Sequence, residues 1–499
     1  MPPPLNLHVG NVTTRIEGFM TNGVKVRLDE ELSYLIPDAG FAVRAWEEKQ
    51  RKALIEEYGY EVGSVMPLPR SWDGRQHFFS RAKSTIPTGL LRRAIGIFKE
   101  NSVPITITNH RVRPDPLLPI HISGFTPYDF QTEIANEAFY RQRGMIQLGT
   151  GGGKGSIIPM LIERVKCPTV VLIHRETIYR QLIDRISSHL GIKVGQCGSG
   201  VFEDADICVA MTPSAVSRGA WLKKFGCVIL DELHHCASRQ AYSTLQSCTN
   251  AFYRYGLTAT PWREDGGEMF LEAAFAGFIC NMGPSELIRR GRLTRPKIFF
   301  LDNPRITKWE MLSYPNQYSK TVVENKFRNQ LIVDAVKYFV GINKTVLIAV
   351  TQIKHGKILM DMLKENLPGY RFQFVKGEDN SDTKQEALRK LNNHEIDGAV
   401  ATTVFGEGVD VPNLGCLINA KGQDSKVDVI QLIGRVLRKT DDKEFAYFID
   451  IFDHQQYTLK HTKRRFEVLG EEPLFHVEHV LSVDDMVKSI ETPSETASV

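Results

Sequence analysis

The chain is poor in the features that define several protein classes. It has 8 cysteines in 499 residues and no Cys-x-x-Cys pair, which excludes a disulfide framework and a zinc site made of such pairs. No apolar run approaches the ~18 residues that a membrane span needs, and the first residues lack the pattern of a signal peptide. These absences predict an intracellular protein in a reducing compartment.

A strong excess of one charge is also absent, because the net charge is only +4. The charges are unevenly distributed, however, since the segment from Ser64 to Arg113 contains nine basic residues and only two acidic ones, Asp73 and Glu100. Such a segment favours a polyanion such as nucleic acid, because each phosphate contact releases condensed counterions. A solvated basic face is the alternative interpretation. The basic residues are Arg70, Arg75, Arg81, Lys83, Arg92, Arg93, Lys99, Arg111 and Arg113.

The length predicts about three domains, because a single hydrophobic core stops growing well below 499 residues. Residues 1–115 are expected to form a small basic α+β domain. In it, the alternation at Val24–Leu28 is typical of a half-buried strand, and residues 89–99 have apolar positions at helical spacing. Four prolines between residues 104 and 119 predict an extended linker.

Two α/β domains are expected next, at residues 116–305 and 306–460. Short apolar runs alternate there with helical stretches, and near-continuous apolar runs belong to parallel sheets that are covered on both faces. Residues 461–499 are expected to form a C-terminal extension that is partly disordered, because it ends in a tail rich in Ser, Thr and Glu. The predicted strands are residues 169–173, 207–211, 227–230, 345–350, 399–402, 416–419 and 445–449.

A glycine-rich loop before a helical stretch predicts a phosphate site. Consecutive glycines allow backbone N–H groups to converge on phosphate oxygens, and the following helix adds its positive end. Lys154 would reach the β- and γ-phosphates of ATP. The next residue is Gly155, where a hydroxyl group would normally bind Mg²⁺, so Ser156 or a water molecule is expected to replace it. The residues expected to bind ATP here are Thr150, Gly151, Gly152, Gly153, Lys154, Gly155 and Ser156.

Two acidic residues follow the predicted strand at residues 227–230. Ligands of parallel sheets bind at the carboxyl ends of the strands. Asp231 would hold Mg²⁺ through water, and Glu232 would act as the general base that polarises the attacking water. His234 is expected to couple this site to the strand that contains Thr258 and Thr260. With His235 and Cys236 it could instead form a metal cluster or pack in the core, but no second ligand pair lies nearby in the sequence.

Two arginines lie roughly 280 residues after the glycine loop, and therefore on the second α/β domain. Arg435 and Arg438 are three residues apart on a predicted helix, hence on one face of it. Two guanidinium groups match the charge that develops on the γ-phosphate. Surface salt bridges are the alternative, which the flanking Gln431 and Gly434 disfavour. Gln131, about 20 residues before the loop, has an amide that could read the adenine edge.

Taken together, these segments resemble motifs Q, I, II, III and VI of superfamily 2 helicases of the DExH type. Further segments resemble motif Ia (175–181), motif Ib (212–214) and motif V (402–410). The resemblance covers about residues 120–455 and implies two tandem RecA-like domains that use ATP and Mg²⁺. It implies contacts to the nucleic-acid backbone by Arg175, Thr212, Thr402 and Thr403. It also implies nucleotide contacts by Gly408 and Asp410, and a coupling role for Thr258, Thr260 and Gln431.

The segment Trp72–Arg75, followed by Pro87 and Gly89-Leu90, resembles the leading domain of phage UvsW-type branch-migration helicases. That resemblance implies contact with duplex DNA by Trp72 and Arg75, although Trp72 could also anchor a core. It implies a monomeric DNA helicase that acts on forks, Holliday junctions or R-loops in replication, recombination or repair, in a bacterial cytoplasm if a phage encodes it. Little sequence specificity is expected, because phosphate contacts do not read bases.

Three other functions fit parts of the pattern. An RNA helicase would share the backbone-gripping motifs, because discrimination between DNA and RNA depends on the 2′-hydroxyl group. The motor of a restriction system is disfavoured, because no nuclease-like cluster of acids with lysine occurs. A nucleotide-gated DNA-binding scaffold with little turnover remains open because of Gly155.

Overall fold

The computed structural model describes residues 3–36, 39–68, 73–116, 119–233, 239–259, 267–309, 311–402, 411–423, 426–440 and 443–492. The chain divides into two compact units. The first comprises residues 1–147 and 155–281, and the second comprises residues 148–154 and 282–499. In the described part of the chain, every helix is too short or too polar to span a membrane.

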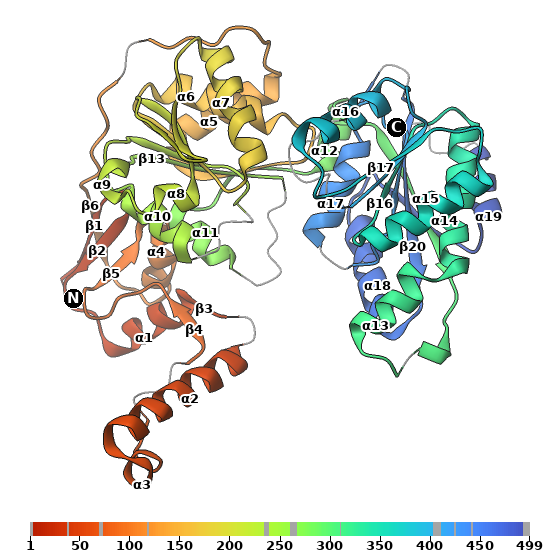
Figure 1. The fold of residues 1–499 in the computed structure, drawn as a ribbon. Helices are drawn as coiled ribbons and strands as arrows, with labels where there is room; N and C mark the ends of the chain where they lie inside the picture. Colours follow the sequence, from red (N-terminus) through yellow and green to blue (C-terminus); the bar gives the residue numbers. More distant parts are fainter. Residues whose placement is uncertain are drawn as a thin grey trace. The chain divides into compact units, whose positions relative to one another are not determined.

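The N-terminal domain is an α+β domain, as predicted. Its four-stranded sheet has the order β5-β2-β1-β6 (Thr85–Pro87, Thr13–Glu17, Leu5–Val9 and Ile105–Asn109), in which only β1 and β6 pair in parallel. A two-stranded ribbon joins β3 (Ser33–Leu35) and β4 (Arg75–His77). Its helices are α1 (Asn22–Glu31), α2 (Ala39–Tyr58), α3 (Tyr60–Gly63) and α4 (Leu91–Glu100), which follows the short 3-10 helix η1 (Thr88–Leu90). Helices α2 and α3 extend away from the rest of the domain (Figure 1).

The strand predicted at Val24–Leu28 is wrong, because these residues lie in helix α1. The side chain of Thr21 caps the helix by accepting a hydrogen bond from the backbone N–H of Val24, at 3.4 Å. Val24 and Leu28 are four residues apart and are the buried residues of this helix. A spacing of four suits a helix as well as it suits a strand, so the alternation alone misled the prediction.

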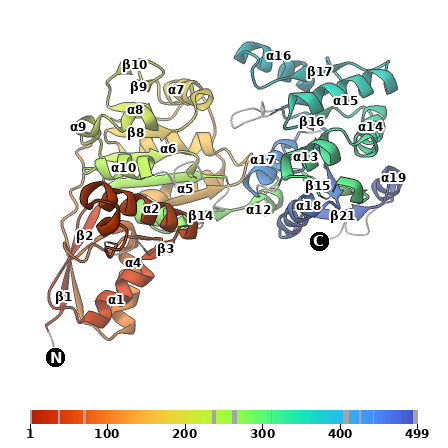
Figure 2. The ribbon, with the colours of Figure 1, turned by 60° about the horizontal axis from the view of Figure 1, so that its bottom comes forward.

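The N-terminal domain and the first parallel sheet share one hydrophobic core. The ring of Phe78 lies 5.1 Å from that of Phe270 and 6.1 Å from that of Tyr242. The side chains of Arg93 and Glu272 form an ion pair across the same boundary, at 2.6 Å. In both views the small sheet lies next to the parallel sheet of the same unit (Figure 1 and Figure 2). The two parts therefore form one compact unit.

The first parallel sheet has eight strands in the order β10-β9-β11-β8-β12-β13-β7-β14, and its edge strand β10 pairs antiparallel with β9. The predicted strands at 169–173, 207–211 and 227–230 are confirmed as β8, β11 and β12. The other strands are β7 (Arg143–Leu148), β9 (Gly195–Gly198), β10 (Val201–Glu203), β13 (Tyr253–Thr258) and β14 (Phe278–Met282). The helices are α5 (Asp129–Arg141), α6 (Lys154–Val165), α7 (Glu176–Leu190), α8 (Thr212–Ala215), α9 (Gly219–Leu222), α10 (Arg239–Ser247) and α11 (Glu268–Phe275).

The second unit contains a seven-stranded parallel sheet with the order β17-β18-β16-β19-β20-β15-β21. Its strands are β15 (Arg295–Asn303), β16 (Val346–Ala349), β17 (Phe372–Val375), β18 (Gly398–Ala401), β19 (Cys416–Asn419), β20 (Phe445–Asp453) and β21 (His476–Val480). Its helices are α12 (Pro284–Arg289), α13 (Tyr314–Tyr318), α14 (Lys326–Gly341), α15 (Ile353–Asn366), α16 (Ser381–Asn392), α17 (Lys426–Val436), α18 (Gln456–Gly470) and α19 (Val483–Glu491). The two parallel-sheet domains after an α+β domain confirm the expected fold class.

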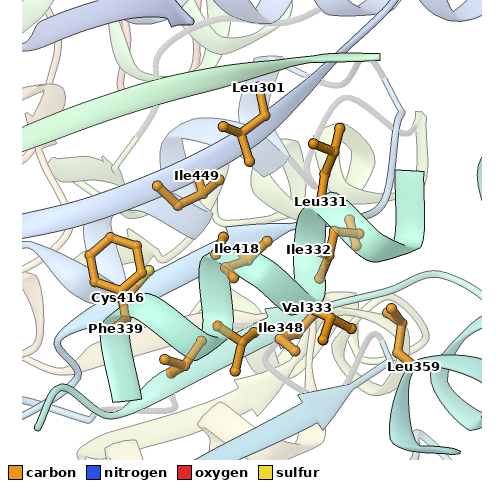
Figure 3. Packing of buried hydrophobic residues seen from close by; sticks show 14 of the residues in the cluster. Leu301, Leu331, Ile332, Val333, Phe339, Ile348, Leu359, Cys416, Ile418 and Ile449 are labelled. Carbon is orange, nitrogen blue, oxygen red and sulfur yellow. The ribbon is translucent and has the colours of Figure 1, made fainter. Parts of the chain in front are cut away.

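The core of this sheet is apolar and continuous. Side chains of α14, among them Ile332 and Phe339, pack on Ile348, Ile418 and Ile449 of adjacent strands (Figure 3). All five side chains are almost completely inaccessible to water. Burying such side chains contributes roughly 1.5–3 kcal/mol each, so this packing fixes the second sheet independently of any ligand.

Two domain boundaries differ from those expected. Strand β15 belongs to the second sheet, although the boundary after residue 305 assigned it to the first α/β domain. The expected C-terminal extension also contributes to this sheet, because β21 pairs in parallel with β15 and Met486 of α19 lies in the core. Residues 493–499 lie outside the described residues.

Gly89 allows a close approach between the N-terminal domain and the first parallel-sheet domain. A Cβ atom there would lie 2.0 Å from the backbone oxygen of Glu272, which cannot move aside as a flexible side chain can. We expect Gly89→Ala to lower the free energy of unfolding by about 2–3 kcal/mol, measured by urea denaturation. The control is Gly96→Ala on helix α4, where nothing lies within 4 Å. It should raise that free energy by about 0.5–1 kcal/mol, and equal stability of the two variants would contradict this packing.

Candidate nucleotide-binding site

Three of the predicted segments follow adjacent strands of the first sheet. Strand β13 lies between β12 and β7 and pairs in parallel with both. Asp231 directly follows β12, Thr258 ends β13, and the glycine loop starts after Leu148 of β7. The register places Thr258 beside Gln147. The carboxyl ends of these strands therefore meet at one edge of the sheet, where such sheets bind ligands.

The glycine loop has the backbone that a phosphate cradle requires. Gly151 and Gly153 have φ angles of +91° and +79°, which residues with a Cβ rarely adopt. The N–H of Gly152 donates to the oxygen of Gly149 at 2.9 Å, closing a tight turn. Helix α6 begins at Lys154 directly after this turn. Convergent N–H groups and a helix N-terminus fit the phosphates of ATP.

Gly155, the main departure from the expected pattern, lies against Arg185 of helix α7. A Cβ atom at Gly155 would lie 1.6 Å from Nη1 of Arg185. The guanidinium group thus occupies the space that the side chain of a serine or threonine would need. Arg185 was not predicted as a site residue, and its place near the loop depends on the packing of α7 on α6. Ser156 lies in the first turn of α6, half-buried.

Asp231 and Glu232 present two buried carboxylates after β12, with 8% and 9% of their surfaces exposed. Oδ1 of Asp231 accepts a hydrogen bond from the N–H of Glu232 at 3.0 Å. Glu232 has a φ of +54°, a left-handed conformation that is uncommon outside glycine and often found at functional sites. Carboxylate oxygens are ligands that Mg²⁺ prefers, so the donor set at this edge fits Mg²⁺ together with ATP.

Gln131 and Thr258 are both buried, with 3% and 1% of their surfaces exposed. Gln131 lies in the first turn of α5, and its Oε1 accepts a hydrogen bond from the N–H of Tyr128 at 3.0 Å. The amide oxygen thereby helps to cap α5, and contact with adenine stays a prediction. The coupling role of Thr258 likewise stays a prediction.

The two predicted arginines do not share one helix face. Arg435 lies on α17, which ends at Val436, whereas Arg438 lies beyond the helix and forms an isolated β-bridge with Leu293. The N–H of Thr294 donates to the oxygen of Leu437 at 2.8 Å, so the chain after Val436 pairs with this segment and does not continue the helix. The charge of Arg435 also acts on Lys421. Burial is the main cause that lowers the pKa of Lys421; the carboxylate of Asp428 raises this pKa, and the guanidinium group of Arg435 lowers it.

Within the second unit, helix α17 lies against the glycine loop, whose residues 148–154 pack with this unit. A Cβ atom at Gly434 would lie 2.5 Å from Cβ of Thr150. A Cβ atom at Gly151 would lie 2.6 Å from Cδ2 of Leu293, the bridge partner of Arg438. The segments that carry Arg435 and Arg438 thus both lie next to residues of the loop. Gln431 lies one helical turn before Arg435.

Two fully buried ion pairs support the start of this helix. Arg465 donates from Nε and Nη2 to the two oxygens of Asp450, both at 2.8 Å, and from Nη1 to the backbone oxygen of Gln423. Arg328 donates from Nε to Asp453 at 3.0 Å and from Nη1 to the backbone oxygen of Ala420 at 3.1 Å. Both arginines therefore hold the segment that leads into α17. Sequence reasoning missed these residues.

The predicted nucleic-acid contacts have different environments. Arg175 is exposed at the N-terminus of α7. Thr212 and Thr402 are buried, and their hydroxyl groups bond to Ile173 O at 3.0 Å and Gly377 N at 2.8 Å, so they also position the loops. Arg75 donates from Nε to Oγ of Ser33 at 2.8 Å within the N-terminal domain. Direct contact with nucleic acid stays a prediction for all four. Trp72, His234, Thr260, Thr403, Gly408 and Asp410 lie outside the described residues.

Two family models match the chain. The model of a type III restriction enzyme, res subunit, matches residues 125–263, and that of a helicase conserved C-terminal domain matches residues 329–440. The DNA 3'-5' translocase XPB2 of Sulfurisphaera tokodaii is 26% identical over 373 residues, 68% of this chain and 84% of that protein. The ATP-dependent DNA helicase uvsW of Enterobacteria phage T4 is 24% identical over 388 residues, 70% of this chain and 76% of that protein.

Among solved structures, S. cerevisiae Dbp5 bound to RNA and ADP BeF3 has a TM-score of 0.51 at 14% identity. The match covers 73% of this chain and 93% of that one. At this identity the likeness shows the fold alone.

Gly155→Ser should supply the missing hydroxyl group at little cost in stability. Only the exposed end of Arg185 must move aside, so the thermal midpoint should stay within about 3 °C of the wild type. We expect the Mg²⁺ concentration for half-maximal ATP hydrolysis to fall several-fold, because a protein oxygen would join the Mg²⁺ ligands. Gly155→Ala is the control, since it adds the Cβ atom without the oxygen. Equal Mg²⁺ dependence of the two variants would contradict this interpretation of Gly155.

Proposed function

We propose that this chain, which is an ATP-dependent helicase of superfamily 2, translocates on DNA and remodels branched DNA substrates. The observation that carries the proposal is the gathering of the phosphate loop, Asp231 and Thr258 at the carboxyl edge of three adjacent parallel strands. Such an edge suits phosphoryl transfer, in which positioning and electrostatic stabilisation supply most of the catalysis.

The residues of this edge, together with the two arginines of the second unit, would divide the chemistry of ATP hydrolysis among them. The glycine loop and Lys154 would hold the β- and γ-phosphates, and Asp231 would bind Mg²⁺ through water. Bound Mg²⁺ would neutralise charge on the phosphate oxygens. Glu232 would accept the proton of the attacking water, and Arg435 and Arg438 would stabilise the charge that develops on the γ-phosphoryl group. The products are ADP and inorganic phosphate.

DNA is favoured over RNA as the substrate by two curated relatives, whose names describe a DNA 3'-5' translocase and a DNA helicase. The basic segment between Ser64 and Arg113 agrees with a phosphate-rich partner. The N-terminal domain shares its core with the first parallel-sheet domain, so the two would act on DNA as one body. A rigid domain ahead of a translocating motor suits the separation of strands at a branch. We propose roles in replication, recombination or repair, and an origin in a phage, on the same grounds.

The first test removes the lysine of the loop. Lys154→Ala should reduce DNA-stimulated ATP hydrolysis by more than ~10²-fold, because the γ-phosphate loses its cation, while DNA binding persists. The matched control is Lys193→Ala, a lysine with 82% of its side chain exposed, which should keep wild-type turnover. Phosphate release and DNA binding are measured on the same preparations. Undiminished ATP turnover in Lys154→Ala would contradict the proposal that this chain is an ATP-driven motor.

The second test compares substrates. Unwinding with Mg-ATP is measured on a fork, a four-way junction, an R-loop and a linear duplex, and ATP hydrolysis is measured with structured RNA. We expect several-fold faster processing of branched DNA than of linear DNA, and weak stimulation by RNA. Stimulation by RNA alone would assign an RNA helicase, and equal rates on branched and linear DNA would contradict the branched-DNA specificity. A rate of phosphate release no higher than that of uncatalysed ATP hydrolysis, with every substrate, would favour a nucleotide-gated DNA-binding scaffold instead.

A further inference from the structure

A cavity of about 380 Å³ lies where the N-terminal domain meets the first parallel sheet, within the first unit. Four arginines from three segments line it, namely Arg92, Arg111, Arg141 and Arg143. No carboxylate belongs to its lining among the described residues. A concave site with four guanidinium groups and no acid favours an anion.

Arg143 is the deepest of these groups. Its Nη2 donates to the backbone oxygen of Asn11 at 2.6 Å, while its Nε is buried and makes no hydrogen bond to the described residues. Burial, together with the guanidinium groups of Arg254 and Arg111, lowers the pKa of Arg143 to about 9. Neighbouring guanidinium groups repel one another, so an anionic ligand in the cavity would reduce this charge repulsion.

Two of the other arginines are already oriented by neighbours. Arg141 donates from Nε to Glu137 at 2.6 Å and from Nη1 to the backbone oxygen of Phe278 at 3.1 Å. Arg111 donates from Nε to Oδ1 of Asn109 at 3.2 Å, and its guanidinium group lies 5.0 Å from the ring centre of Phe252. These contacts fix the direction of both groups before any ligand arrives, which lowers the entropic cost of binding.

Arg92 adds an exposed side chain at the start of α4, and its guanidinium group makes no hydrogen bond or ion pair to another described residue. The first turn of α4, a helix of ten residues, lines the cavity and has neither an acidic residue nor a side-chain cap. Helix α4 continues directly from η1, and the N–H of Leu91 donates to the oxygen of Thr88, so what α4 adds is the partial positive charge of its N-terminus. Helix α4 therefore reinforces the preference of the arginines for an anion.

The cavity also offers surfaces for an apolar group. Tyr140 lines it with 80% of its surface exposed, and Val9, Ile107 and Phe278 supply apolar atoms. Aromatic rings stack on bases of nucleic acids, and cavities of ~300–1,000 Å³ accommodate small ligands. The cavity thus combines a cluster of guanidinium groups with an exposed aromatic ring.

The cavity is separate from the ATP site. Arg143 is the first residue of β7, whereas the glycine loop follows Leu148 at the other end of this strand. Five residue steps along a strand span roughly 17 Å. The cavity is therefore at the amino edge of the parallel sheet, opposite the edge at which ATP is expected.

We propose that this cavity is a second nucleotide-recognition site, in which the arginines bind the phosphate of one nucleotide unit and Tyr140 stacks on its base. An unpaired nucleotide of a DNA strand and a free mononucleotide share this chemistry. The site does not depend on ATP turnover, so it is tested separately from the motor.

The test uses the full chain with Lys154→Ala, which weakens phosphate binding at the glycine loop. Arg92→Ala and Tyr140→Ala are combined in this background, because both side chains are exposed and their loss should not disturb the fold. Arg15→Ala is the control, an arginine of the same domain with 65% of its side chain exposed and outside the cavity lining. Thymidine 5′-monophosphate is titrated calorimetrically, and a fluorescein-labelled oligothymidylate of twelve nucleotides is titrated by anisotropy at several salt concentrations.

We expect the double variant to bind at least one of the two probes about tenfold more weakly than the Lys154→Ala background, while the control matches that background. The slope of the logarithm of strand affinity against the logarithm of salt concentration should also become shallower. The change should correspond to the loss of about one phosphate contact. Weakening with both probes identifies a site for any nucleotide unit, and weakening with the strand alone identifies a site for a nucleotide within DNA. Unchanged affinity for both probes overturns the proposal, whatever the ATPase assays show.

Discussion

The candidate site depends on the parallel direction of three neighbouring strands. Because β12, β13 and β7 run the same way, the residues that follow them emerge at one edge of the sheet. The strands themselves are buried, so polar groups that must reach a ligand are confined to this edge. The strained backbone of Glu232 lies at the same edge, where its neighbours fix it in a conformation that it would not adopt alone.

In the second unit, buried ion pairs hold the segment that leads into α17. Arg328 and Arg465 are fully buried, and each pairs with an aspartate of β20 while donating to the backbone oxygen of residue 420 or 423. Removing one partner of such a pair costs roughly 3–5 kcal/mol, because the other charge stays buried. The position of α17, which carries Arg435, therefore depends on buried charges that are not among the predicted site residues.

The sequence could predict what depends on local pattern. Continuous apolar runs located β8, β11, β12 and β19 with their observed bounds, and Asp231 and Thr258 lie at the predicted strand ends. One prediction failed because a local pattern was ambiguous: the apolar spacing of Val24–Leu28 fits both a strand and a helix. Another failed because of tertiary pairing: Arg438 forms a β-bridge with Leu293 and therefore lies outside the helix. Arg185 could not be predicted, because its approach to Gly155 depends on how α7 packs on α6.

The shared core of the N-terminal domain and the first sheet has a mechanical consequence. Phe270 and Ala273 of α11 are buried among residues of the small sheet, so relative movement of the two parts would expose apolar surface. A strand of DNA held by the arginine-lined cavity would therefore keep a fixed position relative to Asp231 and Glu232. Any movement of this unit during a cycle of hydrolysis would pull on that strand directly, without an intervening hinge. An N-terminal domain tethered only by a flexible linker could not transmit force in this way.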